Sequence, residues 1–284
     1  MGFAVLGTGV PAVSIAQQTP NPEAKPSAVS SPATSPDTIL DDAAQWIGRA
    51  LYARCLCTAS TLSFDATGQL TTKAHPVDWA LAGVQLQRVE RKGDQLEFTG
   101  LRVAAKFADD RREFDRRPLK PDTVKVLTPL PATPAALNAM LSAAFSNGID
   151  RALQQSLPPF WQHYFIPTLP WTGDDALLGT ELVAAGSKAG GEDVPIPKVT
   201  KKPSVSFTDE AARDHIRGEV TLLLTTDTQG KPHRIRIVTP IGYGLDAVAV
   251  DAAAHTTFAP TVIAGKHVAV QFFLKEGFTI DRPF

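Results

Sequence analysis

Residues 203–230 read PSVSFTDEAARDHIRGEVTLLLTTDTQG, and this stretch carries the signals for a short helix, a strand and a tight turn in that order. Thr208 is a suitable N-cap, and the two acids after it lie where a helix dipole favours negative charge. From Val220 to Leu224, apolar residues recur at every second position, which predicts a strand with one buried face. Gly230 ends the turn at a position that suits a positive φ angle. The stretch therefore predicts a helix followed by the first strand of a hairpin.

The residues that follow complete a small α+β unit. Ile235 and Ile237 share one face of the predicted return strand. A glycine-rich turn at residues 242–246 leads into a predicted helix of small residues that runs over 247–255. Apolar residues then alternate between 267 and 274, which predicts the last strand.

The order of these features resembles the C-terminal domain of the TonB energy-transducer family, over about residues 201–284. The resemblance rests on glycines, prolines and apolar residues at the turns and at the starts of strands. These positions are Pro203, Phe207, Gly218, Gly230, Gly242, Gly244, Leu245, Phe258 and Pro260. The resemblance implies a three-stranded antiparallel sheet with two helices on one face. It also implies a module that binds proteins rather than an enzyme.

The chain departs from the ordinary family pattern in two ways. A TonB transducer has an N-terminal membrane helix and a long proline-rich span across the periplasm, and neither is visible in this sequence. Thr256 stands where the family often has a tryptophan. We therefore expect a partner-binding module whose connection to an inner-membrane motor has been lost.

The resemblance places partner binding on the last strand. An edge strand has unpaired backbone donors and acceptors, so an extended peptide can add to it as a further strand. The expected partner is an outer-membrane TonB-dependent receptor or a similar extended segment. The alternatives are an edge covered by residues 275–284 or by a second copy, which would give a homodimer through the C-terminal sheet. The predicted binding residues are His267, Val268, Ala269, Val270, Gln271, Phe272, Phe273 and Leu274.

Residues 37–167 are predicted to form a separate α+β accessory domain with a small meander sheet. A helix opening at Ser35-Pro36-Asp37 carries an apolar stripe that continues to Leu51. Strands follow from Thr61, with a hairpin turn at residues 92–94 and an irregularity at Gly100. Helices are predicted from residue 134 to Asn147-Gly148 and over 149–157. Residues 168–200 are rich in glycine and proline and are predicted to be a linker. A short element packed on either domain is left open there, at Leu177, Leu178, Leu182 and Val183.

The N-terminus carries the signals of export. Residues 1–16 end in Ser14-Ile15-Ala16, a small-x-small pattern typical of a signal-peptide cleavage site, although no basic residues precede the apolar run. Residues 17–36 are proline-rich and predict a disordered tether. We therefore expect a periplasmic protein, secreted across the inner membrane, that begins near Gln17. A membrane anchor is the alternative if the natural N-terminus is longer.

The composition argues against several classes of function. A formal net charge of −1 offers no field that would gather nucleic acid. The six histidines show no metal-ligand spacing, and neither a cofactor nor a small-molecule substrate is evident. Cys55 and Cys57 lie too close for an unstrained bridge across an extended chain, which favours two buried thiols, with a disulfide as the alternative in an oxidising compartment.

Two further features receive structural interpretations. The stretch from Asp109 to Arg117 alternates in charge and is predicted to be a solvated face. Packing against the sheet is favoured over an exposed docking patch for the aromatic set Phe160, Trp161, Tyr164 and Phe165. The rival to a binding adaptor is an enzyme whose site lies in residues 37–165, with the C-terminal module as its targeting domain.

Overall fold

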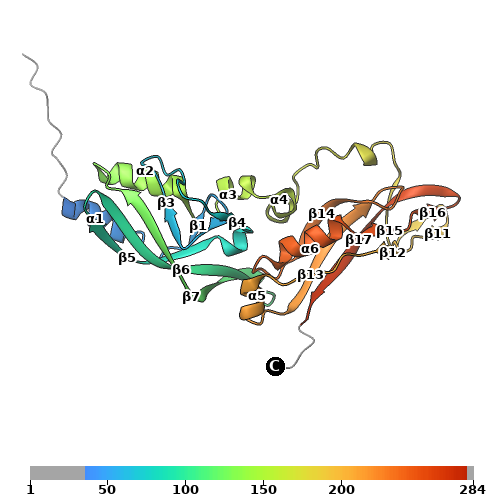
Figure 1. Ribbon diagram of the computed structural model, residues 1–284. Helices are drawn as coiled ribbons and strands as arrows, with labels where there is room; N and C mark the ends of the chain where they lie inside the picture. The colour runs from blue at the N-terminus through green and yellow to red at the C-terminus, as the bar shows by residue number, and fades with distance from the viewer. Residues whose placement is uncertain (1–35, 280–284) are drawn as a thin grey trace, which may run out of the picture. The chain divides into compact units, whose positions relative to one another are not determined.

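The computed structural model describes residues 36–279. The predicted signal segment, and the predicted tether up to residue 35, lie outside the described residues. The described chain is α+β, as the sequence predicts (Figure 1).

A six-stranded sheet forms the N-terminal half, in the order β3-β7-β6-β5-β1-β8. Its centre is a meander, in which β5 and β6 are joined at the predicted Gly93-Asp94 turn and β6 and β7 form a long hairpin. The register of β5 and β6 shifts opposite Gly100, which confirms the predicted irregularity. The strands are β1 (Leu51–Ala53), β3 (Thr61–Ser63), β5 (Gly83–Lys92), β6 (Gln95–Ala108), β7 (Glu113–Pro129) and β8 (Phe145–Asn147).

Helices α1 (Pro36–Ala44) and α2 (Pro134–Ala144) lie together against this sheet (Figure 1). Both start where the sequence predicts, and both end earlier. The first helix was predicted to continue to Leu51, but it ends at Ala44. Leu51 instead pairs with Val84 and Asn147 in the sheet. The second helix likewise stops at Ala144, because Phe145 begins β8.

The charged stretch after β6 is only partly a solvated face, so that prediction was too broad. The β6–β7 hairpin turns at residues 109–112, and Phe114 then contacts Trp79 and Phe107. Arg116 donates to the backbone oxygen of Val84 at 2.9 Å. The ladder to β6 sets this arrangement, and charge alternation alone gives no sign of it.

The two cysteines form a disulfide, which corrects the prediction of free thiols. They lie in the turn after β1, where Leu56 has a φ of 46°, so the chain is not extended and the two side chains do not point to opposite faces. Their Cα atoms are 5.1 Å apart, which is within bridging range. Cys57 then begins β2 (Cys57–Thr58), which pairs with β4 (His75–Pro76).

An aromatic cluster joins the remaining helices of the N-terminal half. Trp161 is fully buried and makes an edge contact with Trp79 at 5.2 Å between ring centroids. Its indole Nε1 donates to the Asp78 carboxylate at 2.6 Å. The predicted packing role of this aromatic set is confirmed for Trp161. The helices that contribute rings are the 3₁₀ helix η1 (Trp79–Leu81) and α4 (Pro159–Phe165), and Leu153 of α3 (Arg151–Ser156) packs in the same core.

The predicted C-terminal strands are all present, but the sheet contains more than three. Strands β14, β13 and β17 are consecutive neighbours and antiparallel, and β17 pairs in addition with β16 and, in parallel, with β9. The prediction of a three-stranded sheet was therefore incomplete. The strands are β9 (Leu182–Ala184), β13 (Gly218–Thr226), β14 (Pro232–Thr239), β16 (Thr261–Ile263) and β17 (Lys266–Phe278).

The expected linker at 168–200 contains several short elements. One of them, β9, lies on the C-terminal sheet, which answers the question that the sequence left open for Leu182 and Val183. The others are η2 (Asp175–Leu177), the hairpin of β10 (Lys188–Ala189) and β11 (Glu192–Asp193), and β12 (Val199–Lys201), which pairs with β15 (Thr257–Phe258).

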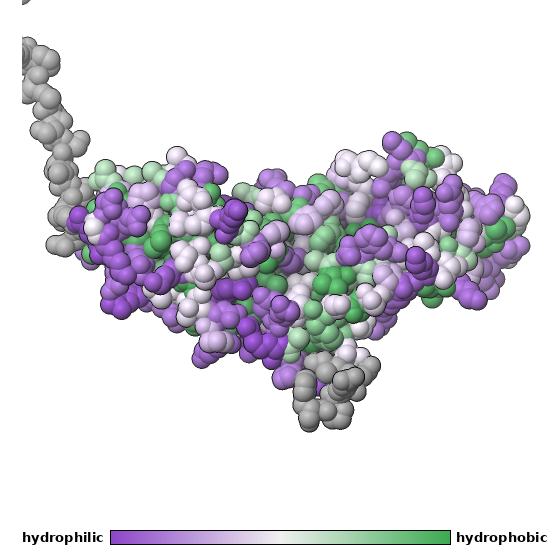
Figure 2. All heavy atoms as spheres, viewed as in Figure 1, coloured by the Kyte–Doolittle hydropathy of each residue, from purple (hydrophilic) through white to green (hydrophobic). Residues whose placement is uncertain are grey.

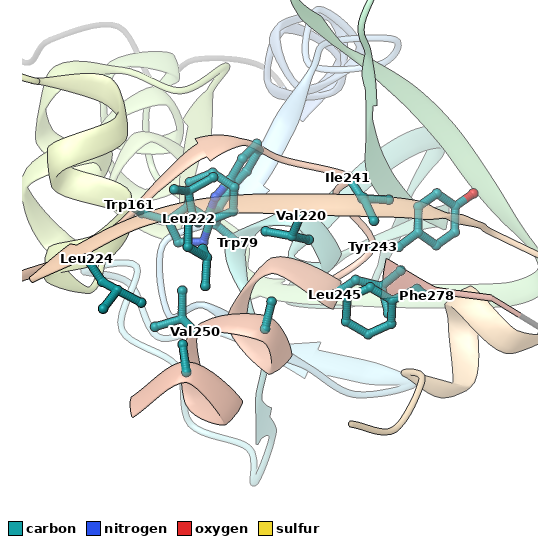
Figure 3. Close-up of a cluster of buried hydrophobic side chains, with 14 of the residues drawn as sticks. Trp79, Trp161, Val220, Leu222, Leu224, Ile241, Tyr243, Leu245, Val250 and Phe278 are labelled. Carbon is teal, nitrogen blue, oxygen red and sulfur yellow. The ribbon is translucent and has the colours of Figure 1, made fainter. Parts of the chain in front are cut away.

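Helices α5 (Asp209–Arg213) and α6 (Leu245–Ala254) complete the C-terminal half. Val220, Leu222 and Leu224 of β13 are fully buried, as their alternation predicts. Figure 3 shows these side chains gathered with Leu245 and Val250 of α6 and with the tryptophans of the N-terminal half. The predicted domain boundaries at 37–167, 168–200 and 201–284 stay a prediction, but this hydrophobic core crosses them.

Candidate partner-binding edge

The eight predicted binding residues, 267 to 274, are consecutive in β17. One side of this strand pairs with β13, from Val270 to Phe278. The hairpin partner β16 pairs with His267 and Val268 of β17. Three consecutive residues, Ala269 to Gln271, pair with β9. The edge that the sequence predicts to be open is therefore occupied over part of its length.

Backbone direction separates the two sides of β17. The N–H of Ala269 donates to the oxygen of Glu181 at 3.0 Å, and the oxygen of Gln271 accepts from the N–H of Ala185 at 2.9 Å. Backbone groups alternate between the two sides of a strand, so Phe273, Lys275 and Gly277 direct theirs to the same outer side as Ala269. Among the described strands none pairs with this outer side beyond Gln271. The result is a short stretch of unpaired donors and acceptors.

An apolar hollow of about 280 Å³ adjoins this open stretch. Phe273 and Ile196 on its wall are 60% and 68% exposed. Figure 2 shows apolar residues reaching the viewed face of the molecule as patches between hydrophilic ones. Within the described residues, every large exposed apolar side chain except Ile47 comes from the region 178–273, and these are Leu178, Leu182, Ile196, Val199, Val262 and Phe273. Of these, Ile196 and Phe273 lie together on the wall of the hollow, and an exposed apolar patch of this kind is typical of a surface that binds another protein.

Charges near the open edge are balanced. Lys275 on the strand pairs with Glu219 at 2.7 Å, and the buried Glu276 pairs with Lys202 at 2.8 Å. A strongly charged partner finds no single-sign field here, so we expect recognition through backbone and apolar contacts.

The segment that leads into β9 is anchored on β14. Arg234 Nε donates to Asp174 Oδ2 at 2.8 Å, and His233 lies between Asp227, at 3.0 Å, and Asp174, at 4.0 Å. Burial alone would raise the pKa of Asp227, but hydrogen bonds from the N–H of Lys231 and from His233 lower it below its usual value. We call residues 174–185 the strap, because they connect this anchor to the opposite edge of the sheet.

The sequence left open a short element within the strap, but it did not predict that this element pairs with β17. Its signal was weak: a short apolar pair, Leu182-Val183, between Gly179 and Gly186. Three strand residues bounded by glycines fit a loop as well as a strand, and the pairing depends on contacts distant in sequence.

Two carboxyl groups in the core that joins the two halves, those of the buried Asp246 and the half-buried Asp78, accept hydrogen bonds from backbone N–H groups. Asp246 accepts from the N–H groups of Ile241 and Gly242 at 2.8 and 2.7 Å, which fixes the turn before α6. Asp78 accepts from the N–H of Ala80 and caps η1. Burial raises the pKa of Asp246 to about 8 and that of Asp78 to about 6. These hydrogen bonds to backbone give both carboxyl groups a structural role.

Within residues 36–279, no set of three or more His, Cys, Asp or Glu side chains is arranged to hold a metal ion. The helices described there also include none with the length and apolar character needed to cross a bilayer.

Comparison with known proteins identifies the C-terminal part. Residues 203–279 match the family model described as Gram-negative bacterial TonB protein C-terminal. These residues form a TonB C-terminal domain. A solved structure, the solution NMR structure of the Pseudomonas aeruginosa TonB C-terminal domain, is similar at 24% identity over 31% of this chain and 89% of that one, with a TM-score of 0.26. No curated protein matches the chain.

Two of the positions that carry the TonB resemblance are explained by close backbone contact. Gly230 has a φ of 83°, and a Cβ there would lie 2.0 Å from the oxygen of Phe258. Gly242 has a φ of 90°, and a Cβ there would lie 2.1 Å from the oxygen of Ala105. Neither position has room for a side chain. The TonB domain indicates a protein-binding role in transport through the cell envelope, and domains of this family are not enzymes.

Proposed function

We propose that this chain is a periplasmic adaptor that binds the extended N-terminal segment of an outer-membrane TonB-dependent receptor, and so takes part in transport across the outer membrane. Binding occurs by strand addition to the outer side of β17, at residues 267–274 and onward to Gly277. The observation that carries the proposal is an outer edge on the last strand of a TonB C-terminal domain that no described strand pairs with beyond Gln271.

The chemistry of the edge supports this mode of binding. The outward backbone groups of Phe273 and Gly277 can bond to any extended chain, since main-chain bonding does not depend on side chains. The hollow beside Phe273 can take an apolar side chain of the partner. Affinity comes from the ladder, and the hollow adds selectivity for an apolar residue at one position.

Titration of the isotope-labelled full chain with synthetic peptides from receptor N-terminal segments tests the proposal. We expect backbone amide shifts concentrated in residues 267–277. Gln271→Ala should keep the ladder, because its side chain supplies none of the ladder bonds, and should change affinity only through its part of the hollow wall. Lys275→Pro removes an outward N–H and should abolish binding while the inner ladder to β13 is kept. The proposal fails if millimolar peptide shifts no amide of this strand, both in the natural chain and in the Val183→Pro variant described below.

A further inference from the structure

The strand-addition edge already holds a strand of the same chain. β9 lies parallel to β17 on its outer side and pairs with Ala269, Val270 and Gln271, in the middle of the predicted binding residues. Its flanking bonds, from Ala269 to Glu181 and from Ala185 to Gln271, are those that an added peptide would make. We propose that residues 181–185 are an internal occupant of this edge, which a partner segment must displace, and that the partner runs parallel to β17. This inference rests on the proposed function.

β9 is more easily exchanged than β13, the neighbour on the other side of β17. It pairs through only three residues, whereas β13 pairs through nine and carries buried core residues. Leu182 is 47% exposed and Ala184 is exposed, so two of the three side chains of this strand bury little surface. Val183 and Ala185 are half-buried against the core. Short strands with few buried side chains open at low free-energy cost compared with core strands.

The anchor of the strap is separate from the edge. Asp174 is bonded to Arg234 on β14, which lies on the other side of β13 from β17. When β9 leaves β17, this ion pair can keep the strap attached to the domain. A tethered strand competes at high effective concentration and returns as soon as the partner leaves. The strap therefore raises the affinity that a partner needs.

The sequence and direction of β9 indicate what kind of partner segment can replace it. Its sequence is Glu-Leu-Val-Ala-Ala, with Val183 and Ala185 turned toward the core and Leu182 outward. A partner that replaces it runs parallel and carries small or β-branched apolar residues at alternate positions. A partner longer than β9 gains the open bonding positions at Phe273 and Gly277, which the strap does not use. Those extra bonds supply the driving force for displacement.

A peptide of residues 179–187, GTELVAAGS, is a probe that needs no knowledge of the natural partner. In the natural chain the occupied edge should resist it. Val183→Pro removes the N–H at the centre of β9 and should free the edge, so that the peptide binds in trans at Ala269–Gln271. If β9 is paired at least nine-tenths of the time, the apparent Kd should fall at least about ten-fold in this variant. Leu182→Pro is the matched control, because its N–H faces away from β17, and it should bind like the natural chain.

Equal affinity of this peptide for the natural chain and for Val183→Pro would overturn the proposal. Hydrogen exchange in the natural chain is a second measurement, free of any substitution: the Ala269 amide, bonded to β9, should exchange at least about ten-fold faster than the Val270 amide, which faces β13. Equal protection of the two amides would also overturn it.

Receptor peptides distinguish the two proposals. If they bind neither chain while GTELVAAGS binds the variant, the receptor function fails and the internal occupant stands. If receptor peptides bind the natural chain and the Val183→Pro variant equally, the receptor function stands and the internal occupant fails.

Discussion

The backbone N–H of Tyr243 donates a 2.9 Å hydrogen bond to the backbone oxygen of Ala105, which ties the turn before α6 to strand β6. A second bond, from the N–H of Phe107 to the oxygen of Ile241 at 2.8 Å, lies beside it. The TonB domain and the N-terminal half are therefore joined by main-chain bonds as well as by a common hydrophobic core.

Gly242→Ala should destabilise both halves together. The new Cβ would lie 2.1 Å from the oxygen of Ala105, and φ is 90°, so the backbone must move. We expect a loss of about 2–4 kcal/mol in the free energy of unfolding. Urea unfolding followed by tryptophan fluorescence and by far-UV circular dichroism should give one shared, lowered midpoint. Gly265→Ala is the control, since that site is open and only its φ of 77° is unfavourable, at about 1 kcal/mol. Two separate transitions would contradict the shared core.

The buried Asp246 predicts a pH dependence of stability. Burial raises the pKa of its carboxyl to about 8, above the unfolded value of about 4. The folded state then holds a proton that the unfolded state releases, so the free energy of unfolding should fall as pH rises from about 4 to about 8. Asp78, with a pKa raised to about 6, acts in the same direction. Urea midpoints measured at intervals across this range give the slope.

Asp246→Asn separates the two roles of this side chain. It removes the titration, so the slope of stability against pH should become shallower. It also turns an NH₂ group toward one of the N–H donors of Ile241 and Gly242, which should cost about 1–3 kcal/mol at low pH. An unchanged slope would show that Asp246 is ionised in the folded state over the whole range.

Local patterns in the sequence were enough to predict α5, β13, β14, α6 and β17 of the TonB domain, but not the short strands β15 and β16. The cap at Thr208 and the alternation from Val220 act within a few residues, and α5 and β13 form where those patterns lie. The family resemblance located the candidate edge on β17, and whether partners bind there stays a prediction.

What the sequence could not predict depends on contacts distant along the chain. Leu51 fits the helix stripe, but β1 forms because Val84 and Asn147 pair with it. Leu182 lies in a stretch with the composition of a linker, and it becomes part of a strand because it pairs with β17. The Cys55–Cys57 bridge depends on the positive φ of Leu56, and no local sequence pattern predicts that φ angle.

Reduction of the Cys55–Cys57 bridge should have a small effect on stability. The bridge spans a separation of two residues, so it restricts the unfolded chain very little. The loop-entropy relation gives at most about 2 kcal/mol for so short a loop. Unfolding curves with and without dithiothreitol, and of the Cys55→Ser/Cys57→Ser variant, should therefore lie close together. A loss well above this figure would assign the bridge a larger structural role.

Phe273→Ala should weaken partner binding and leave stability unchanged. The ring is 60% exposed on the wall of the hollow, so removing it should change the free energy of unfolding by no more than about 0.5 kcal/mol. The hollow then loses one apolar wall, and affinity for receptor peptides should fall several-fold. Val262→Ala is the matched control, because Val262 is 49% exposed on β16, which does not line the hollow. Calorimetric titration of both variants makes the comparison. Equal losses in the two would mean that exposed apolar area in general, rather than the hollow beside β17, attracts the peptide.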